Sequence, residues 1–121
     1  MRSAGQQRAG RTGRMAEHIA ALFLMAKGYR ILARRYGGKG GEIDLIAKRG
    51  DTIAFVEVKA RGTMEAALGS ITAEKQRLVA RRINTWRGQN AWASGATFRA
   101  DAMFLAPWCW PRHINAIFEL R

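Results

Sequence analysis

Residues 41–61, GEIDLIAKRGDTIAFVEVKAR, constrain the fold more than any other stretch of this chain. Two runs rich in Ile, Val, Leu and Phe flank residues 49–52, Arg-Gly-Asp-Thr, which have the composition of a turn. The pattern therefore predicts two strands joined as a hairpin. With residues 49–52 as the loop, Lys48 lies opposite Ile53, and this pairing fixes the register of both strands.

The predicted register brings acidic side chains together on one face of the hairpin. Because side chains alternate along a strand, Asp44 is expected opposite Glu57, and Glu42 opposite Lys59. The Cβ atoms of directly opposed residues are roughly 4.5–5.5 Å apart, and like charges placed in this way destabilise a sheet. We therefore expect a compensating charge beside Asp44 and Glu57.

The spacing alone leaves two interpretations of this acidic pair open. In the first, a divalent cation, Mg²⁺ or Mn²⁺, lies between Asp44 and Glu57, since these ions favour hard oxygen ligands and Mg²⁺ often uses only one or two carboxylates. Lys59 then holds or helps to deprotonate a water, or stabilises charge on a phosphate. In the second, the face is solvated, Glu42 pairs with Lys59, and nothing binds.

Several motifs resemble known proteins. Asp44 followed by Glu57-Val58-Lys59 resembles the PD-(D/E)XK nuclease signature. The chain also resembles the YraN family of small bacterial proteins in longer motifs: GRMAE at residues 13–17, GYRIL at 28–32, GEIDLIA at 41–47 and FVEVKAR at 55–61. These motifs extend the resemblance over nearly all of the chain from Gly13 onward.

The resemblance implies a fold, an activity and a set of site residues. The fold is α/β and restriction-endonuclease-like, with a mixed β-sheet flanked by helices in the order αβββαββ. The activity is hydrolysis of phosphodiester bonds that depends on Mg²⁺ or Mn²⁺, in branched or repair-related DNA. Related branched-DNA resolvases act as dimers, so a homodimer is implied as well. The implied metal ligands are Asp44, Glu57 and the helix carboxylate Glu17; the other catalytic residues are Lys59 and Lys75, and Glu42 lies beside the ligands.

The charge balance indicates the kind of partner. The 121 residues suffice for one domain with a real core, and they carry 21 Lys and Arg against 9 Asp and Glu. The resulting formal charge of +12 favours polyanions, first of all nucleic acid and in particular DNA. A membrane partner is not expected, because no apolar run approaches the ~20 residues that a spanning helix needs. The residues expected to contact nucleic acid are Lys39, Arg61, Arg77, Arg81 and Arg82.

The remaining patterns place other elements around the hairpin. A strand, a helix and a further strand in that order predict a crossover that returns to a parallel neighbour. Residues 1–12 have the composition of a disordered basic tail, so the endonuclease-like domain is expected at 13–121. The predicted elements are a helix at 14–27, a strand at 29–36, a flexible connection at 62–70, a helix at 72–87, and strands at 97–105 and 114–120.

The last quarter of the chain contains an Arg-x-Asp pair, two tryptophans and the single cysteine. The first two features each have two interpretations, and the cysteine indicates a cellular location. Arg99 and Asp101 resemble the next motif of the family, or they form a local ion pair. The rings of Trp108 and Trp110 either stack on bases or cover an edge of the core, and we favour the core. A single cysteine, Cys109, excludes an internal disulfide and a CxxC zinc motif, which favours the cytoplasm.

The function expected from these patterns is that of a metal-dependent nuclease, or of a DNA-processing protein built on one. The alternative is a nucleic-acid-binding protein of the same fold that has no catalytic turnover and acts within a larger assembly. The sequence favours the nuclease, since opposed carboxylates repel phosphate and give a pure binding protein no advantage.

Overall fold

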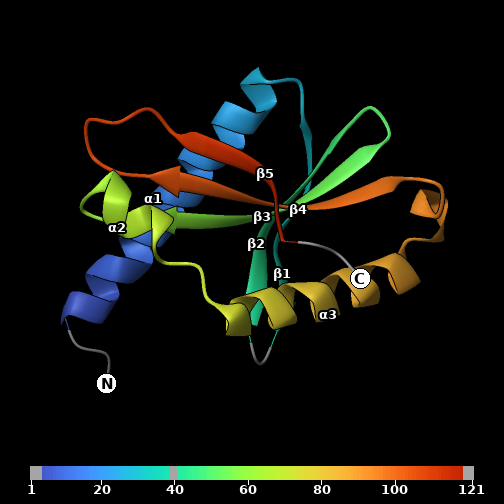
Figure 1. Ribbon diagram of the computed structural model, residues 1–121, viewed down its shortest axis with the longest axis horizontal. Helices are drawn as coiled ribbons and strands as arrows, with labels where there is room; N and C mark the ends of the chain where they lie inside the picture. The colour runs from blue at the N-terminus through green and yellow to red at the C-terminus, as the bar shows by residue number, and fades with distance from the viewer. Residues whose placement is uncertain (1–3, 39–40, 119–121) are drawn as a thin grey trace.

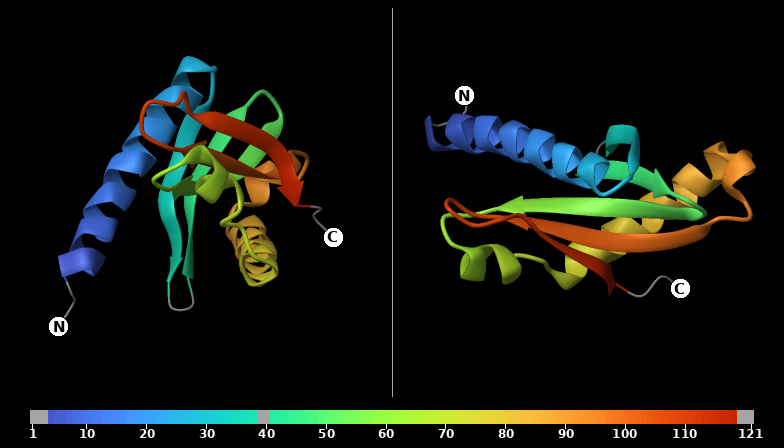
Figure 2. Two further views of the ribbon diagram at one scale, coloured as in Figure 1. Left: turned by 60° about the vertical axis from the view of Figure 1, so that its left-hand side comes forward. Right: turned by 90° about the horizontal axis from the view of Figure 1, so that it is seen from above.

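The protein is a five-stranded sheet between helices. The computed structural model describes residues 4–38 and 41–118, and the side chains of residues 13–38 and 41–117. Helix α1 covers one face of the sheet, while α2 and α3 cover the other (Figures 1 and 2). The elements are α1 (Ala4–Ala26), β1 (Arg30–Gly38), β2 (Gly41–Arg49), β3 (Thr52–Ala60), α2 (Met64–Leu68), α3 (Ala73–Gln89), the 3₁₀ helix η1 (Ala91–Ala93), β4 (Thr97–Leu105) and β5 (Arg112–Phe118). This is the mixed α/β architecture that the sequence predicts.

The strands lie in the order β1-β2-β3-β4-β5. Strands β3 and β4 are parallel, from Thr52 opposite Thr97 to Ala60 opposite Leu105. The other neighbouring strands are antiparallel. The connection from β3 to β4 contains α2, α3 and η1, which confirms the predicted crossover to a parallel neighbour.

The hairpin of β2 and β3 has the predicted register. Lys48 lies opposite Ile53, and the pairing also includes Arg49 opposite Thr52. Gly50 and Asp51 therefore form the turn, which is shorter than the predicted loop. The φ of Gly50 is 59°, a left-handed value that a two-residue hairpin turn requires and that glycine adopts without strain.

Strands β2 and β3 separate toward the far end of the hairpin. Their pairing extends only to Leu45 opposite Val56, and beyond it Figure 1 shows β2 diverging from β3. The N–H of Val58 donates to Oδ2 of Asp44 at 2.7 Å instead of to the backbone of β2. We call this region, residues 41–44 and 57–60, the fork.

The fork corrects both charged pairs of the sequence prediction. The described ladder between β2 and β3 ends before it would pair Asp44 with Glu57 or Glu42 with Lys59. Glu42 instead pairs with Gly37 of β1, and Lys59 with Phe104 of β4. The β1–β2 hairpin keeps its own pairing while it turns away from the rest of the sheet, as strongly twisted two-stranded ribbons do.

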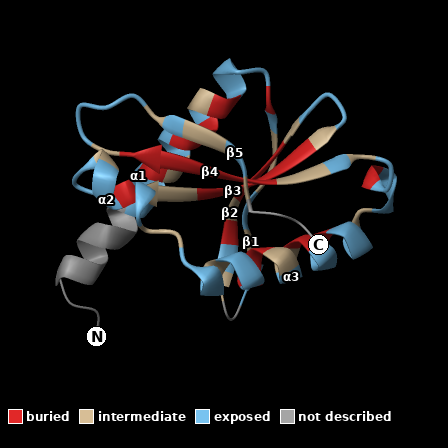
Figure 3. Ribbon diagram, viewed as in Figure 1, coloured by how far each residue is buried: buried red, intermediate tan, exposed pale blue. Residues whose placement is uncertain are grey.

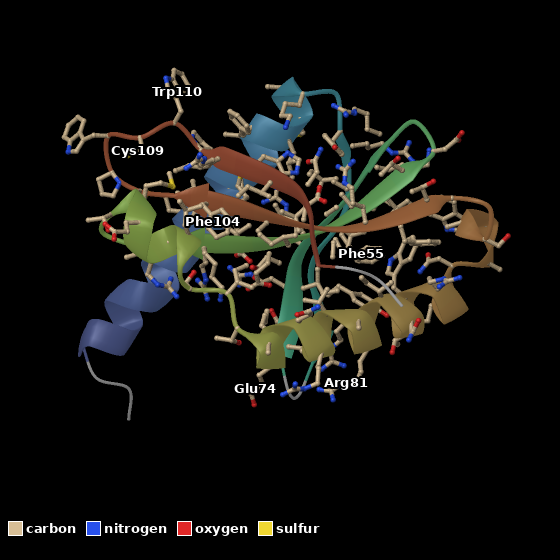
Figure 4. The ribbon with its side chains drawn as sticks, viewed as in Figure 1. Phe55, Glu74, Arg81, Phe104, Cys109 and Trp110 are labelled. Carbon is tan, nitrogen blue, oxygen red and sulfur yellow. The ribbon has the colours of Figure 1, made fainter. Side chains whose placement is uncertain are left out.

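The sheet divides the core into two layers of buried side chains. Leu24 of α1 packs with Leu45 and Val56 on one face. On the other face Phe55 contacts Trp86 of α3, with ring centroids 5.5 Å apart in an edge-to-face arrangement. Figure 3 shows burial concentrated on the central strands and the inward faces of the helices, and Figure 4 shows the side chain of Phe55 inside the molecule.

Two segments are more helical than predicted. Helix α1 begins at Ala4, so the backbone is helical through residues 4–12 of the predicted disordered tail, and residues 1–3 lie outside the described residues. Ala, Gln and Arg are good helix formers and no proline interrupts them, so the helix continues ahead of the predicted start at residue 14 despite the unfavourable Gly5 and Gly10. The domain boundary at residue 13 stays a prediction.

Helix α2 lies in the predicted flexible connection, where Thr63 caps it by accepting the N–H of Ala66. Within the described ranges, none of the helices has the length and apolarity needed to span a membrane.

Candidate active site

The fork brings the carboxyl groups of Asp44 and Glu57 near each other. Glu57 is only 4% exposed. Burial, and next the negative charge of Glu57, raise the pKa of Asp44 from 3.8 to about 7, although the N–H of Val58 and the charge of Lys75 act in the opposite direction. The Asp44 carboxyl therefore loses its proton much closer to neutral pH than an ordinary aspartate does.

Glu57 lies between two lysines. The Nζ of Lys59 is 3.2 Å from Oε1, and the Nζ of Lys75 is 3.2 Å from Oε2. Although Oε2 is in ion-pair contact, it is buried and has no hydrogen-bond partner among the described residues. The Lys75 ammonium donates instead to the backbone carbonyl of Glu42, at 3.1 Å. Oε2 therefore retains the capacity to accept one more ligand.

The N-terminal turn of α3 positions Lys75. Thr72 accepts the backbone N–H of Lys75 at 3.1 Å and so caps the helix where the sequence predicted its start. Lys75 is thus one of the first residues of a helix that Leu78 and Val79 anchor to the sheet. The cap fixes the point from which the lysine side chain extends to Glu57.

A cleft of about 990 Å³ lies against the fork. Its wall is formed by α1, Arg35 of β1, the fork, the last residue of β4 and the connection that follows β4. Its charged lining residues are Arg14, Glu17, Arg35, Glu42, Asp44, Lys59 and Arg61. Much of the remaining wall is apolar, formed in part by Met15, Ile19, Leu105, Pro107 and Pro111. The cleft combines charge and an apolar surface, as sites for organic ligands commonly do.

Glu17, implied as a metal ligand, reaches this cleft but has a partner of its own. Nη2 and Nε of Arg35 donate to Oε2 of Glu17 at 2.7 and 2.9 Å. This bond, and next the negative charge of Glu17, raise the pKa of Arg35. The described residues contain no cluster of three or more His, Cys, Asp or Glu side chains arranged to hold a metal ion. Asp44 lines the cleft, and Glu57 is buried behind that wall, close enough for its charge to act on Asp44.

Sequence reasoning missed Arg35 because its direction depends on an irregular backbone. Arg34 contacts His18 of α1, with its Nη1 3.0 Å from Nδ1, and Arg35 also reaches α1. Tyr36 donates to Gln89 of α3, on the opposite face. The φ of Arg35 is 52°, a left-handed value that breaks the alternation of the strand, and no pattern in the sequence marks it.

The residues expected to contact nucleic acid do not share one surface. Arg61 lines the cleft. Arg77 and Arg81 are exposed, and Figure 4 shows Arg81 pointing away from the sheet. Arg82 is partly buried and its Nε donates to the backbone carbonyl of Gly41 at 3.1 Å, so its contact with nucleic acid stays a prediction. Lys39 lies outside the described residues.

Arg99 and Asp101 form a buried network away from the fork. Arg99 donates to both carboxylate oxygens of Asp101 at 2.8 Å, and the Nε2 of His113 lies 2.8 Å from Oδ2. Burial raises the pKa of Asp101, but hydrogen bonds from His113 and Arg99 outweigh it, so the pKa lies below its usual value. Arg99 also donates to the hydroxyl of Tyr29. This network joins β4 and β5 to Tyr29 in the connection between α1 and β1, which favours the interpretation as a structural ion pair.

The interpretation of Trp108 and Trp110 as rings that cover the core is wrong. Trp108 is fully exposed and Trp110 is 86% exposed. They belong to the connection between β4 and β5, which extends from the ends of these two strands. Composition alone did not distinguish this arrangement from a folded-back turn.

Comparison with known proteins gives a consistent result. The family model described as "Uncharacterised protein family UPF0102" matches residues 16–105. A UPF0102 protein of Methylocella silvestris is 54% identical over 121 residues, which span 99% of this chain and 98% of the relative. One of Methylorubrum extorquens is 56% identical over 108 residues, 89% of this chain and 84% of the relative. One of Mesorhizobium japonicum is 44% identical over 116 residues, 96% and 93% of the two chains.

Proposed function

The chain belongs to the uncharacterised protein family UPF0102, the YraN family that its motifs resemble, and we propose that it is a metal-dependent nuclease that hydrolyses phosphodiester bonds in DNA. The observation that carries this proposal is the pair of carboxyl groups at the fork. Burial, and next the charge of Glu57, raise the pKa of Asp44, and a divalent cation bound between the two carboxylates would offset this electrostatic cost.

The donor set of the fork fits Mg²⁺ or Mn²⁺. Glu57 offers the buried oxygen Oε2, which lacks a hydrogen-bond partner among the described residues. Asp44 offers a second carboxylate beside it. Mg²⁺ commonly uses one or two carboxylates and completes its shell with water and phosphate oxygens, so the absence of a third acidic ligand among the described side chains is compatible with it. When bound, such a cation stabilises negative charge on phosphate oxygens and lowers the pKa of water.

The cationic residues of the site would act on the phosphate and on water. Lys59, with an ammonium in contact with Glu57, holds a water or stabilises charge on the phosphate in the transition state. Lys75 approaches from the other side of Glu57 and orients that carboxylate. Glu17 contributes negative charge to the cleft while Arg35 engages it, so we assign the metal-binding role chiefly to Asp44 and Glu57.

One observation favours the alternative, a nucleic-acid-binding protein without turnover. Lys59 and Lys75 already compensate the charge of Glu57, so this carboxylate is stable without a metal ion. The two functions make different predictions for cation uptake. A nuclease requires it, whereas a binding protein of net charge +12 holds nucleic acid without it.

Calorimetric titration of Mg²⁺ and Mn²⁺ into wild-type protein and Glu57→Gln tests the proposal. Glu74→Gln is the matched control, because Glu74 is exposed in the first turn of α3 and the chemical change is the same. Each protein is then incubated with branched, duplex and single-stranded DNA, and with RNA. We expect cation binding and cleavage to be lost together in Glu57→Gln and retained in Glu74→Gln. Nucleic-acid binding without cation uptake or cleavage by the wild-type protein would establish the alternative.

The proposal also includes a location and an assembly. The free thiol of Cys109 is exposed, which suits a reducing cytoplasm. A homodimer is the arrangement that the resemblance to branched-DNA resolvases implies, and sedimentation of the purified protein measures it directly.

A further inference from the structure

The connection between β4 and β5, residues 106–111, carries two large exposed aromatic rings. Trp108 is 104% exposed and Trp110 is 86% exposed. Figure 4 shows Trp110 projecting from this connection away from the sheet. Scattered exposed apolar residues are ordinary, but two large exposed Trp rings two residues apart on one short connection are typical of a recognition surface.

The backbone of this connection holds Trp108 outward at a cost. The N–H of Cys109 donates to the carbonyl of Ala106 at 3.2 Å, which closes a four-residue turn with Pro107 and Trp108 at its centre. Trp108 has a φ of 63°, and together with a proline before it this value defines a type II turn. Glycine or asparagine normally occupies that position, because a side chain is strained there. Backbone strain of this kind is commonly found where a side chain serves function.

The same connection forms part of the wall of the cleft. Pro107, Cys109 and Pro111 line the cleft together with Asp44 and Lys59. Ala106 lines the cleft as well, whereas Trp108 and Trp110 of the same connection do not line it and are exposed to solvent. A ligand that extends out of the cleft past this wall meets their rings.

Charge and surface chemistry identify the kind of ligand. The chain carries a formal charge of +12, and Arg14 and Arg61 lie on the walls of the cleft. Met15 and Ile19 of α1, both exposed, add an apolar wall. Cationic groups that follow a phosphate backbone, together with aromatic rings and apolar surface for bases, are the combination that single-stranded nucleic acid requires. A duplex keeps the faces of its bases stacked and cannot use the rings.

We propose that Trp108 and Trp110 stack on unpaired bases, so that the substrate class is nucleic acid with a single-stranded segment beside the cleft. This inference rests on the proposed function in one respect, namely that the scissile phosphate lies at the proposed metal site. The rings themselves contribute affinity for single strands with or without a metal ion.

Fluorescence anisotropy in the presence of EDTA tests the proposal with a labelled oligo(dT) strand and a labelled blunt-ended duplex of two complementary strands. The variants are Trp108→Ala and Trp110→Ala, and the matched control is Trp92→Ala. Trp92 is 60% exposed but belongs to η1, at the opposite end of the sheet from the β4–β5 connection (Figure 1). We expect each of the two test variants to bind the single strand at least about fivefold more weakly, with unchanged duplex affinity, and the control to bind as wild type does. Trp108→Tyr, which keeps an aromatic face, should retain most of the affinity.

Several results would overturn the proposal. Unchanged single-strand affinity in both test variants excludes stacking. An equal loss for the single strand and the duplex assigns the effect to the backbone instead of to the bases. Binding to phosphatidylglycerol vesicles that depends on the two rings, with oligonucleotide binding unaffected, makes the connection a membrane contact. Because the substituted rings are exposed, unfolding temperatures near that of the wild type should confirm that each variant is folded.

The failure of this inference is distinguishable from the failure of the proposed function. Glu57→Gln should lose cation uptake and cleavage but keep its affinity for the single strand in EDTA. If the wild-type protein takes up no cation and cleaves nothing while the Trp variants still lose single-strand affinity, the nuclease proposal fails and the stacking surface stands.

Discussion

Replacing Asp44 by Asn tests the electrostatic state of the fork most directly. Asn has the shape of a protonated Asp, and its side-chain oxygen can still accept the N–H of Val58. The substitution therefore removes the ionisable group and little else. In metal-free protein at alkaline pH, we expect Asp44→Asn to be more stable than the wild type, although it removes a residue of the proposed site.

The magnitude follows from the pKa of Asp44, which is about 7 in the folded protein against an ordinary value of 3.8. One pKa unit corresponds to about 1.4 kcal/mol. At pH values above the folded pKa, ionisation of Asp44 therefore lowers the free energy of unfolding by about 4 kcal/mol. This figure is an upper limit, because neighbouring groups rearrange and water enters when the carboxyl ionises.

The direction of the pH dependence follows from the same shift. Because folding raises the pKa, the folded protein binds more protons than the unfolded chain between pH 3.8 and about 7. The contribution of Asp44 to the free energy of unfolding therefore falls as the pH rises through this window. The advantage of Asp44→Asn should be close to zero at the acidic end and largest above the folded pKa.

Urea unfolding followed by tryptophan fluorescence, across this pH range and in EDTA, measures the effect. Asp51→Asn is the control, since Asp51 is exposed in the hairpin turn and its substitution should leave the pH dependence of the wild type intact. Added Mn²⁺ should stabilise the wild type, by mass action on the folded state, and leave Asp44→Asn unchanged. Identical pH profiles for the wild type and Asp44→Asn would refute the reasoning.

Three further predictions concern the site and its supports. Lys59→Met should abolish cleavage, because a catalytic ammonium acts on the transition state. Single-strand binding should change little, because one charge adds little to affinity. Cleavage and anisotropy assays on the same protein check both outcomes. Arg61→Ala should reduce by about one the slope of the logarithm of single-strand affinity against the logarithm of salt concentration. Arg81→Ala should leave this slope unchanged, because the side chain of Arg81 points away from the sheet. Affinities measured at several salt concentrations decide between these outcomes. Thr72→Ala should lower the free energy of unfolding by about 1 kcal/mol through loss of the α3 cap, and urea unfolding that matches the wild type would contradict this assignment.

The sequence predicted the parts of the fold that depend on local pattern. The hairpin register follows from alternating apolar residues and a Gly-containing turn, and Lys48 opposite Ile53 confirms it. The parallel pairing of β3 and β4 follows from the order of elements and the handedness of crossovers. In both cases the signal extends over many residues, so that one atypical residue does not change the outcome.

The sequence did not predict the features that depend on tertiary geometry. The fork arises where the twist of β1 and β2 carries them away from β3, and no residue marks that point. Arg35 reaches Glu17 only because its φ is 52°, a value that arginine rarely adopts. The outward direction of Trp108 likewise depends on a turn position that usually requires glycine. Such strained positions are where local rules fail and where function is often found.

The position of Asp44 and Glu57 on one hairpin has a consequence for the order of folding. A hairpin closes through contacts between residues near in sequence, whereas β4 reaches β3 only after the long connection through α2 and α3 has been ordered. The mutually repelling carboxylates are therefore brought together early, before the parallel strand docks. Lys75 belongs to the connection that is ordered later. Until it arrives, the nascent hairpin contains Glu57 without one of its two counter-charges, and conditions that protonate or ligate the acidic pair should accelerate the first stage of folding.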